Sequence, residues 1–277
     1  MDLRVTLSPN APSECPVFAY TGGRSPAPDR PWIVFLHGAG NDHSVWMLQT
    51  RAFAARGWNV LAPDLPGHGR SGGEALDTIE ALADWTLRLL DAAAIERCAL
   101  VGHSMGSLIA LHLASIAPER VFRLALVGSV FPMPVAPALL DKARIDPPAA
   151  HALINQWSFA PATLLGRSAV PGIHPAAVNE RLLQRQPVGT LPVALQACNA
   201  YAGGFEAAAR IHCPTLLLSA AQDRMTPPKA LAPLADAFTS SAMPQRVVIP
   251  GAGHAMMNEA PTAVLEALER FMTPPAG

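Results

Sequence analysis

The amino-acid sequence predicts an α/β protein with a mostly parallel central sheet flanked by helices, and with a helical segment inserted between two strands. Short apolar runs alternate with longer segments of helical periodicity. This alternation stops between residues 129 and 205, where prolines and short helical patterns take over. We therefore expect residues 1–128 and 206–277 to form the core, and residues 129–205 to form an inserted helical cap (lid).

Six short apolar runs without polar alternation predict the parallel strands, because such strands are covered by helices on both faces. Nearer the N-terminus, residues 5–7 and 17–20 predict an antiparallel hairpin at one edge of the sheet. The six predicted parallel strands are Trp32–Leu36, Asn59–Ala62, Ala99–Val101, Leu124–Val127, Thr215–Ser219 and Arg246–Ile249.

Apolar residues at helical spacing predict the helices that cover this sheet. The helices of the core are expected at about residues 45–56, 77–94, 104–117, 228–238 and 260–272. Within the insertion, shorter patterns predict helices at about residues 138–157, 175–186 and 191–201.

Composition limits the classes of protein that fit this chain. Its 277 residues are 50% hydrophobic and 15% charged, which is enough to bury a large core. The formal net charge is -1 and no run of Lys or Arg stands out, so we expect no nucleic-acid partner. The 4 cysteines lack Cys-x-x-Cys spacing and are expected to be buried thiols.

Two uncharged runs, at residues 98–118 and 124–140, have the length of a membrane span but are interrupted by polar residues or prolines. The N-terminal segment also lacks the basic and apolar pattern of a signal peptide. We therefore expect a cytoplasmic protein without a membrane span, acting on a small molecule. The sequence leaves the oligomeric state open.

The pentapeptide Gly-His-Ser-Met-Gly at residues 102–106 joins a strand-like run to a helix-like pattern that ends near Pro118. The chain must turn sharply here, and a side chain at either glycine would clash with the flanking residues. The turn presents the Ser104 hydroxyl at a helix N-terminus, where backbone N–H groups and the helix dipole stabilise negative charge. Ser104 is therefore a candidate nucleophile.

A serine hydroxyl needs a general base, and the base needs a group that orients it. Asp223 follows a predicted strand in a polar loop, and His254 follows the last predicted strand in a glycine-containing turn. The order Ser, Asp, His places each group after a different strand. Asp64, which follows an earlier strand, is the chief rival to Asp223 for the role of the orienting acid.

These residues and two further motifs resemble the α/β-hydrolase fold family. The segment His-Gly-Ala-Gly at residues 37–40 follows a predicted strand, as the oxyanion loop of that family does. Residues 63–71, Pro-Asp-Leu-Pro-Gly-His-Gly-Arg-Ser, are similar to a turn that is common in the family. The match extends from about residue 31 to the C-terminus.

The resemblance implies a Ser104 nucleophile, a His254 base and an Asp223 that orients the base. It also implies that the backbone N–H groups of Ala39 and Met105 form an oxyanion hole, and it implies no cofactor. Within the same family, a serine at this position disfavours haloalkane dehalogenases and epoxide hydrolases, which use a carboxylate there.

Four further residues are candidates for the substrate pocket: His37, His103, Met133 and Trp157. His37 is also well placed to structure the oxyanion loop by hydrogen bonding. Asp42 and His43 lie nearby, but no His-Glu-x-x-His or comparable ligand set accompanies them, so we expect no metal.

We expect a serine hydrolase that cleaves a small to medium, largely apolar ester-type substrate through an acyl-enzyme. A carbon–carbon bond hydrolase, a thioesterase, a lactonase or a cofactor-free haloperoxidase using the same three residues is an alternative. The residues after His254 lack the aromatic side chain of ring-cleavage hydrolases, which disfavours the first of these. A protein of another class would bind a small ligand in the same pocket without catalysis.

Overall fold

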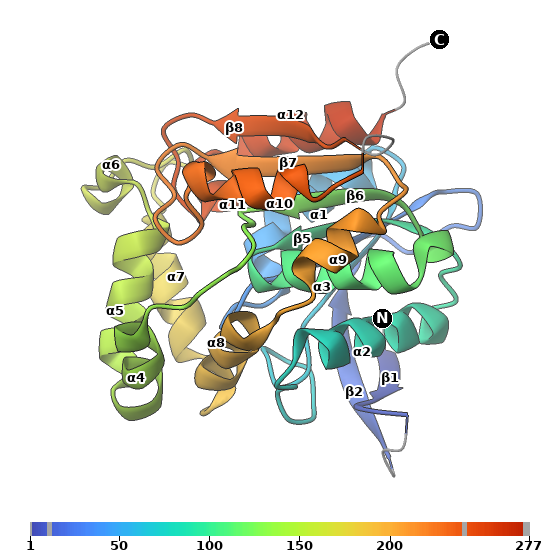
Figure 1. The fold of residues 1–277 in the computed structure, drawn as a ribbon, viewed down its shortest axis with the longest axis horizontal. Helices are drawn as coiled ribbons and strands as arrows, with labels where there is room; N and C mark the ends of the chain where they lie inside the picture. Colours follow the sequence, from blue (N-terminus) through green and yellow to red (C-terminus); the bar gives the residue numbers. More distant parts are fainter. Residues whose placement is uncertain (1, 10–12, 240–242, 274–277) are drawn as a thin grey trace.

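The computed structural model describes residues 2–9, 13–239 and 243–273. Within these ranges the strands form an eight-stranded sheet in the order β1-β2-β4-β3-β5-β6-β7-β8 (Figure 1). The two N-terminal strands pair antiparallel at one edge, and all pairs from β4 to β8 are parallel. The strands are β1 Asp2–Thr6, β2 Glu14–Tyr20, β3 Trp32–Leu36, β4 Asn59–Pro63, β5 Cys98–His103, β6 Val121–Val127, β7 Thr215–Ala220 and β8 Gln245–Ile249.

Most of the helices lie where the apolar spacing predicted them. Those in the first half of the core are α1 Met47–Ala55, α2 Ile79–Ala92 and α3 Met105–Ile116. Those between β6 and β7 are α4 Pro137–Ile145, α5 Pro147–Ser158, α6 Pro161–Leu164, α7 Pro175–Gln184, α8 Thr190–Ala200 and α9 Gly204–Ala209. Those after β7 are α10 Ala232–Asp236, α11 Met256–Glu259 and α12 Pro261–Met272, and three 3₁₀ turns cover His43–Trp46, Pro118–Arg120 and Pro228–Leu231.

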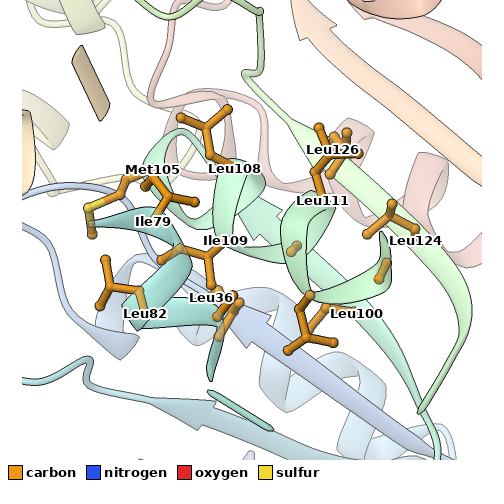
Figure 2. Close-up of a cluster of buried hydrophobic side chains, with 14 of the residues drawn as sticks. Leu36, Ile79, Leu82, Leu100, Met105, Leu108, Ile109, Leu111, Leu124 and Leu126 are labelled. Carbon is orange, nitrogen blue, oxygen red and sulfur yellow. The ribbon is translucent and has the colours of Figure 1, made fainter. Parts of the chain in front are cut away.

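The pleat of the central strands sends alternate side chains into two hydrophobic layers. Val34 and Leu36 of β3 belong to one cluster with residues of α2 and α3. Figure 2 shows Leu36 beside Ile79 and Leu82 of α2 and Ile109 of α3. Ile33 and Phe35 of the same strand pack in a second cluster with residues of α1 and α12. All four of these β3 side chains are fully buried. Both faces of the sheet are therefore covered, which explains why the strands read as continuous apolar runs.

Parallel registration brings the carboxyl ends of the central strands to one edge of the sheet. Leu36 of β3 lies opposite Gly102 of β5, and His103 of β5 lies opposite Val127 of β6. On the other side of β6, the end of β7 lies opposite Ile249 of β8. The loops that leave these five strands are consequently neighbours, although they are far apart in the sequence.

The helices α4 to α8 gather on one side of the molecule, at the left of Figure 1. The predicted helix at 138–157 is in fact two helices, because Asp146 caps α5 by accepting from the backbone N–H of Ala149 at 3.2 Å and Pro147 begins it. The helices α6, α9 and α11 were not predicted. Since α9 contacts α3, the predicted boundary at 205/206 cuts a helix that packs on the core.

Two further sequence expectations concern cysteines and membrane spans. The four cysteines are free, with Cys98 and Cys198 buried and Cys15 and Cys213 half-buried. Burial raises the pKa of both Cys98 and Cys198 to about 12, so these two thiols stay protonated. No helix within the described ranges combines the length and the apolar character needed to cross a bilayer.

Candidate active site

Ser104 occupies the sharp turn between β5 and α3. Its backbone has φ 54° and ψ -119°, a region that residues with a side chain rarely adopt. A Cβ at Gly102 would overlap the carbonyl group of Gly106, and a Cβ at Gly106 would overlap the backbone of Leu36. Glycine on both sides is therefore a steric requirement of the turn, as the sequence predicted.

Hydrogen bonds hold this strained turn in place. The backbone N–H of Ser104 donates to the carbonyl oxygen of Val127 at 3.0 Å, which ties the turn to the end of β6. The carbonyl oxygen of Ser104 accepts from the Ser107 hydroxyl at 2.5 Å, and Ser107 Oγ lies 2.8 Å from Ser129 Oγ. The position of the Ser104 side chain is thus determined by two strands and a helix together.

His254 and Asp223 meet at the same edge of the sheet. The imidazole Nδ1 of His254 donates to Asp223 Oδ2 at 2.8 Å, and both residues are about 95% buried. The two loops are themselves joined, because the backbone N–H of Gln222 donates to the carbonyl oxygen of Ala252 at 2.9 Å. With Nδ1 engaged by the carboxylate, Nε2 is the ring nitrogen that can accept a proton.

Asp223 is held as a carboxylate. Burial alone raises the pKa of its carboxyl group, but the His254 imidazole and the hydrogen bonds from Thr226 outweigh this effect and lower the pKa to about 2. Oδ1 accepts from the backbone N–H groups of Met225 and Thr226, each at 2.8 Å. Thr226 Oγ1 donates to Oδ2 at 2.7 Å and lies 3.1 Å from His254 Nδ1.

Asp64, the rival acid, is engaged elsewhere. Its Oδ1 accepts from the backbone N–H of His43 at 2.8 Å and from the His43 imidazole at 2.7 Å, and its Oδ2 accepts from the backbone N–H of Arg70. Asp42 pairs with Arg185 just after α7, with Nη2 2.6 Å from Oδ2. Possible ligand atoms of Asp42, His43 and Asp64 lie within 4.8 Å of one another, and hydrogen bonds occupy both carboxylates.

A cavity of about 170 Å³ lies next to Ser104 and His254. The predicted pocket residues His103, Met133 and Trp157 line it, as does Ala39. An enclosed apolar space of about 150 Å³ is enough to hold benzene. The cavity therefore suits a small or medium organic group, and most of its surface is apolar.

His37, the fourth residue predicted for the pocket, does not line the cavity. Its fully buried ring bridges two loops behind the cavity wall. Nδ1 lies 2.9 Å from the carbonyl oxygen of Gly38, and Nε2 accepts from the backbone N–H of Leu65 at 3.0 Å. Burial lowers the pKa of His37, consistent with a neutral ring that accepts through Nε2. These contacts join the loop at residues 37–40 to Leu65 in the loop after β4.

His103 supports the backbone of His254. Its Nε2 donates to the His254 carbonyl oxygen at 3.0 Å, and the centroids of the two rings are 4.5 Å apart. Burial, reinforced by the nearby His254 ring, lowers the pKa of His103 to about 3, so its imidazole stays neutral.

Met105 is the first residue of α3, where a backbone N–H has no partner inside the helix. Its amide is thus available beside Ser104.

Sequence reasoning missed six polar residues that line the cavity: Asn41, Ser158, Asn179, Arg224, Thr226 and Asn258. The spacing of Asp223 and Thr226 is typical of a loop in which an aspartate accepts from residues two and three positions later. This pattern could have identified Thr226. No sequence signal marks Asn179, because it enters the cavity through the packing of α7.

Comparisons with known proteins identify the family and the fold of the chain. A family model described as the alpha/beta hydrolase fold matches residues 31–261. A protein of Klebsiella pneumoniae (strain 342) named as a carbamate hydrolase, RutD, is 31% identical over 245 residues, which are 83% of this chain and 87% of that protein. The structure of a thermophilic esterase from Thermogutta terrifontis with malate bound has a TM-score of 0.83 at 22% identity, covering 98% of both chains.

A shorter match concerns the dihydrolipoyllysine-residue acetyltransferase component of the acetoin cleaving system of Pseudomonas putida, 41% identical over 99 residues. It covers 35% of this chain and 26% of that protein, so the chain spans about a quarter of its length. The family model, by contrast, extends from the strand before the 37–40 loop to the start of the last helix. On this evidence the chain belongs to the α/β hydrolase fold family.

Proposed function

We propose that this protein is a serine hydrolase that cleaves a small to medium, largely apolar ester-type substrate through an acyl-enzyme. The observation that carries the proposal is the hydrogen bond between His254 Nδ1 and Asp223 Oδ2 at the cavity that Ser104 and His254 both line. In this proposal Ser104 is the nucleophile, His254 the general base and Asp223 the orienting acid.

Acylation begins when His254 Nε2 accepts the Ser104 hydroxyl proton while Oγ attacks the carbonyl carbon. The carbonyl electron pair moves onto oxygen, and the backbone N–H groups of Ala39 and Met105 donate to the resulting oxyanion. When the oxyanion collapses, the bond to the leaving alcohol breaks, and the imidazolium returns its proton to the alcohol. The Asp223 carboxylate stabilises the imidazolium in the meantime.

Deacylation repeats the same steps with water. His254 removes a proton from water while the water oxygen attacks the acyl carbon. The second tetrahedral intermediate collapses with cleavage of the bond to Ser104 Oγ, and the imidazolium returns its proton to that oxygen. The products are a carboxylic acid and regenerated enzyme. All of the proton transfers pass through one nitrogen, so no bound cofactor takes part in this scheme.

The helices α4 to α8 serve as the cap in this proposal. Trp157 of α5 and Asn179 of α7 line the cavity from this side, and Met133 lines it from the segment before α4. Since the cavity measures about 170 Å³, we expect acyl chains of moderate length to be preferred over long ones.

Two measurements test the proposal. A fluorophosphonate should label wild-type protein at Ser104 and should not label the Ser104→Ala variant, as seen by mass spectrometry of tryptic peptides. In parallel, p-nitrophenyl esters from acetate to dodecanoate should give a maximum in kcat/KM at short or medium chains. Absence of both labelling and turnover would contradict the proposal and favour a protein that only binds a small ligand.

A second candidate substrate is a carbamate, because the relative named as a carbamate hydrolase is 31% identical over most of this chain. The same attack by Ser104 on a carbamate carbonyl would release an alcohol or an amine. Thioesters, lactones and carbon–carbon bonds next to a carbonyl group are also open to this chemistry. Turnover of a matched ester, thioester, lactone and carbamate separates these possibilities.

A further inference from the structure

Asn179 is a buried polar residue in a mostly apolar part of the cavity wall, the part that the segment between β6 and β7 forms. Its neighbours there are mostly apolar, yet Asn179 is an amide and only 7% of it is exposed. Burying an amide costs free energy unless its polar atoms find partners. The apolar neighbours include Met133, Val135, Leu139, Ile154, Trp157 and Leu195.

A chain of hydrogen bonds sets the orientation of the Asn179 amide. A carboxylate only accepts, so Glu180 Oε2 accepts from Asn155 Nδ2 at 2.8 Å. The Asn155 amide therefore turns its oxygen the other way, and this Oδ1 accepts from Asn179 Nδ2 at 2.8 Å. The Asn179 amide nitrogen is thereby directed to Asn155. Its Oδ1 remains as an acceptor with no hydrogen-bond partner among the described residues.

Glu180, where this series of hydrogen bonds starts, lies away from the cavity and is held by its own neighbours. Glu180 Oε1 accepts from Gln184 Nε2 at 2.8 Å, one helical turn further along α7. The His151 imidazole of α5 lies 3.6 Å from the same oxygen. Glu180 is not among the residues that line the cavity, so it can act on a substrate only through the two asparagines.

We propose that Asn179 is a specificity-determining residue whose Oδ1 accepts a hydrogen bond from a hydroxyl or amide N–H group on the substrate. The preferred acyl group is then apolar in most of its surface and carries one hydrogen-bond donor. This inference rests on the proposed function, since the same cavity must hold the acyl group. A site whose buried acceptor is left unpaired discriminates against the analogue that lacks the donor.

Pairs of esters that differ by one hydroxyl group test this inference. The p-nitrophenyl esters of lactate and isobutyrate exchange a hydroxyl for a methyl group beside the carbonyl, and those of 3-hydroxybutyrate and isovalerate do so one carbon further away. For at least one pair, Asn179→Leu should lower the kcat/KM ratio of hydroxyl to methyl ester by about tenfold. Comparison between variants removes the intrinsic difference in reactivity between the two esters.

A variant outside the cavity wall provides the sharper test. Glu180→Gln replaces an acceptor with a group that also donates, which allows both asparagine amides to flip. We expect the same ratio to fall about threefold. Arg181→Gln, an exposed position on the same helix, is the matched control and should keep the wild-type ratio.

The outcomes separate this inference from the proposed function. If wild type hydrolyses both pairs, but Asn179→Leu and Glu180→Gln leave both ratios unchanged, the role of Asn179 is overturned while the hydrolase stands. If no ester is turned over and fluorophosphonate does not label Ser104, the proposed function fails and this inference fails with it. If circular dichroism shows that Asn179→Leu does not fold, the Glu180→Gln ratio decides.

Discussion

The imidazole Nδ1 of His254 lies 2.8 Å from Oδ2 of Asp223, although the two residues belong to loops that follow different strands. The same carboxylate also accepts two backbone N–H groups and the Thr226 hydroxyl. These contacts hold Asp223 ionised and fix the Nδ1 edge of the His254 ring. The orientation of the proposed base therefore depends on a small network rather than on one pair.

Asp223→Asn should reduce kcat by about 10³- to 10⁴-fold, because an amide neither stabilises the imidazolium nor selects the tautomer that leaves Nε2 free. The loop should persist, since the amide oxygen can still accept from Met225 and Thr226. Steady-state kinetics with an active ester, together with thermal unfolding, measure the two effects. Asp236→Asn, whose side chain is 73% exposed, is the control and should keep wild-type kcat.

Thr226→Val should lower kcat about tenfold with little change in KM. Valine has nearly the same shape but removes the hydroxyl that donates to Asp223 Oδ2, so the carboxylate and the His254 ring lose a constraint. Thr226→Ser keeps that donor and should recover most of the activity. Equal kcat for the valine and serine variants would show that the hydroxyl has no positioning role.

Ser104→Ala and Ser104→Gly should both remove nearly all turnover, but their stabilities should differ. Alanine keeps the unfavourable φ of 54°, whereas glycine adopts it without steric cost. We expect the glycine variant to have a free energy of unfolding about 1 kcal/mol higher than the alanine variant. Urea denaturation of the two variants measures this difference, and a less stable glycine variant would show that the turn stores no strain.

Acid should destabilise the fold below about pH 6.5. Burial, with a contribution from a neighbouring histidine, lowers the pKa of both His68 and His103 from 6.5 to about 3. Between these values the unfolded chain binds a proton at each of these two histidines and the folded chain excludes both, so the free energy of unfolding falls as pH falls. Each histidine contributes a slope of about 1.4 kcal/mol per pH unit in this window.

Replacing one of these histidines should reduce the slope of the free energy of unfolding against pH by the contribution of one proton, about 1.4 kcal/mol per pH unit. His68→Gln is the test, because His68 Nε2 is buried without a hydrogen-bond partner among the described residues and cannot take up a proton cheaply. Urea titrations at several pH values between 4 and 7 give the slopes, and an unchanged His68→Gln slope would contradict the assignment.

A feature of this protein could be predicted from the sequence when the residues that determine it are close together along the chain. The turn at Ser104 was predictable because its Gly-x-Ser-x-Gly pattern and the clash of a Cβ at Gly102 with Gly106 lie within a few residues, whereas the clash at Gly106 is with the backbone of Leu36 on another strand. The split at Asp146 was also local, since an N-cap followed by proline marks a helix start, but the longer apolar pattern obscured it. The sequence left His37 with two roles, in the pocket or in the oxyanion loop, because a histidine beside a predicted loop gives no sign of which way its ring turns.

Sequence by itself determined the α/β class and the succession of strands along the chain, because apolar periodicity and turn chemistry are properties of neighbouring residues. It offered Ser104 and His254 as site residues and left Asp223 and Asp64 as rivals for the acid. Only the tertiary structure decided that Asp223 rather than Asp64 contacts His254, and that Asn179 enters the cavity wall. Those contacts join segments separated by many residues, and their geometry follows from sheet registration and helix packing, which no local pattern encodes.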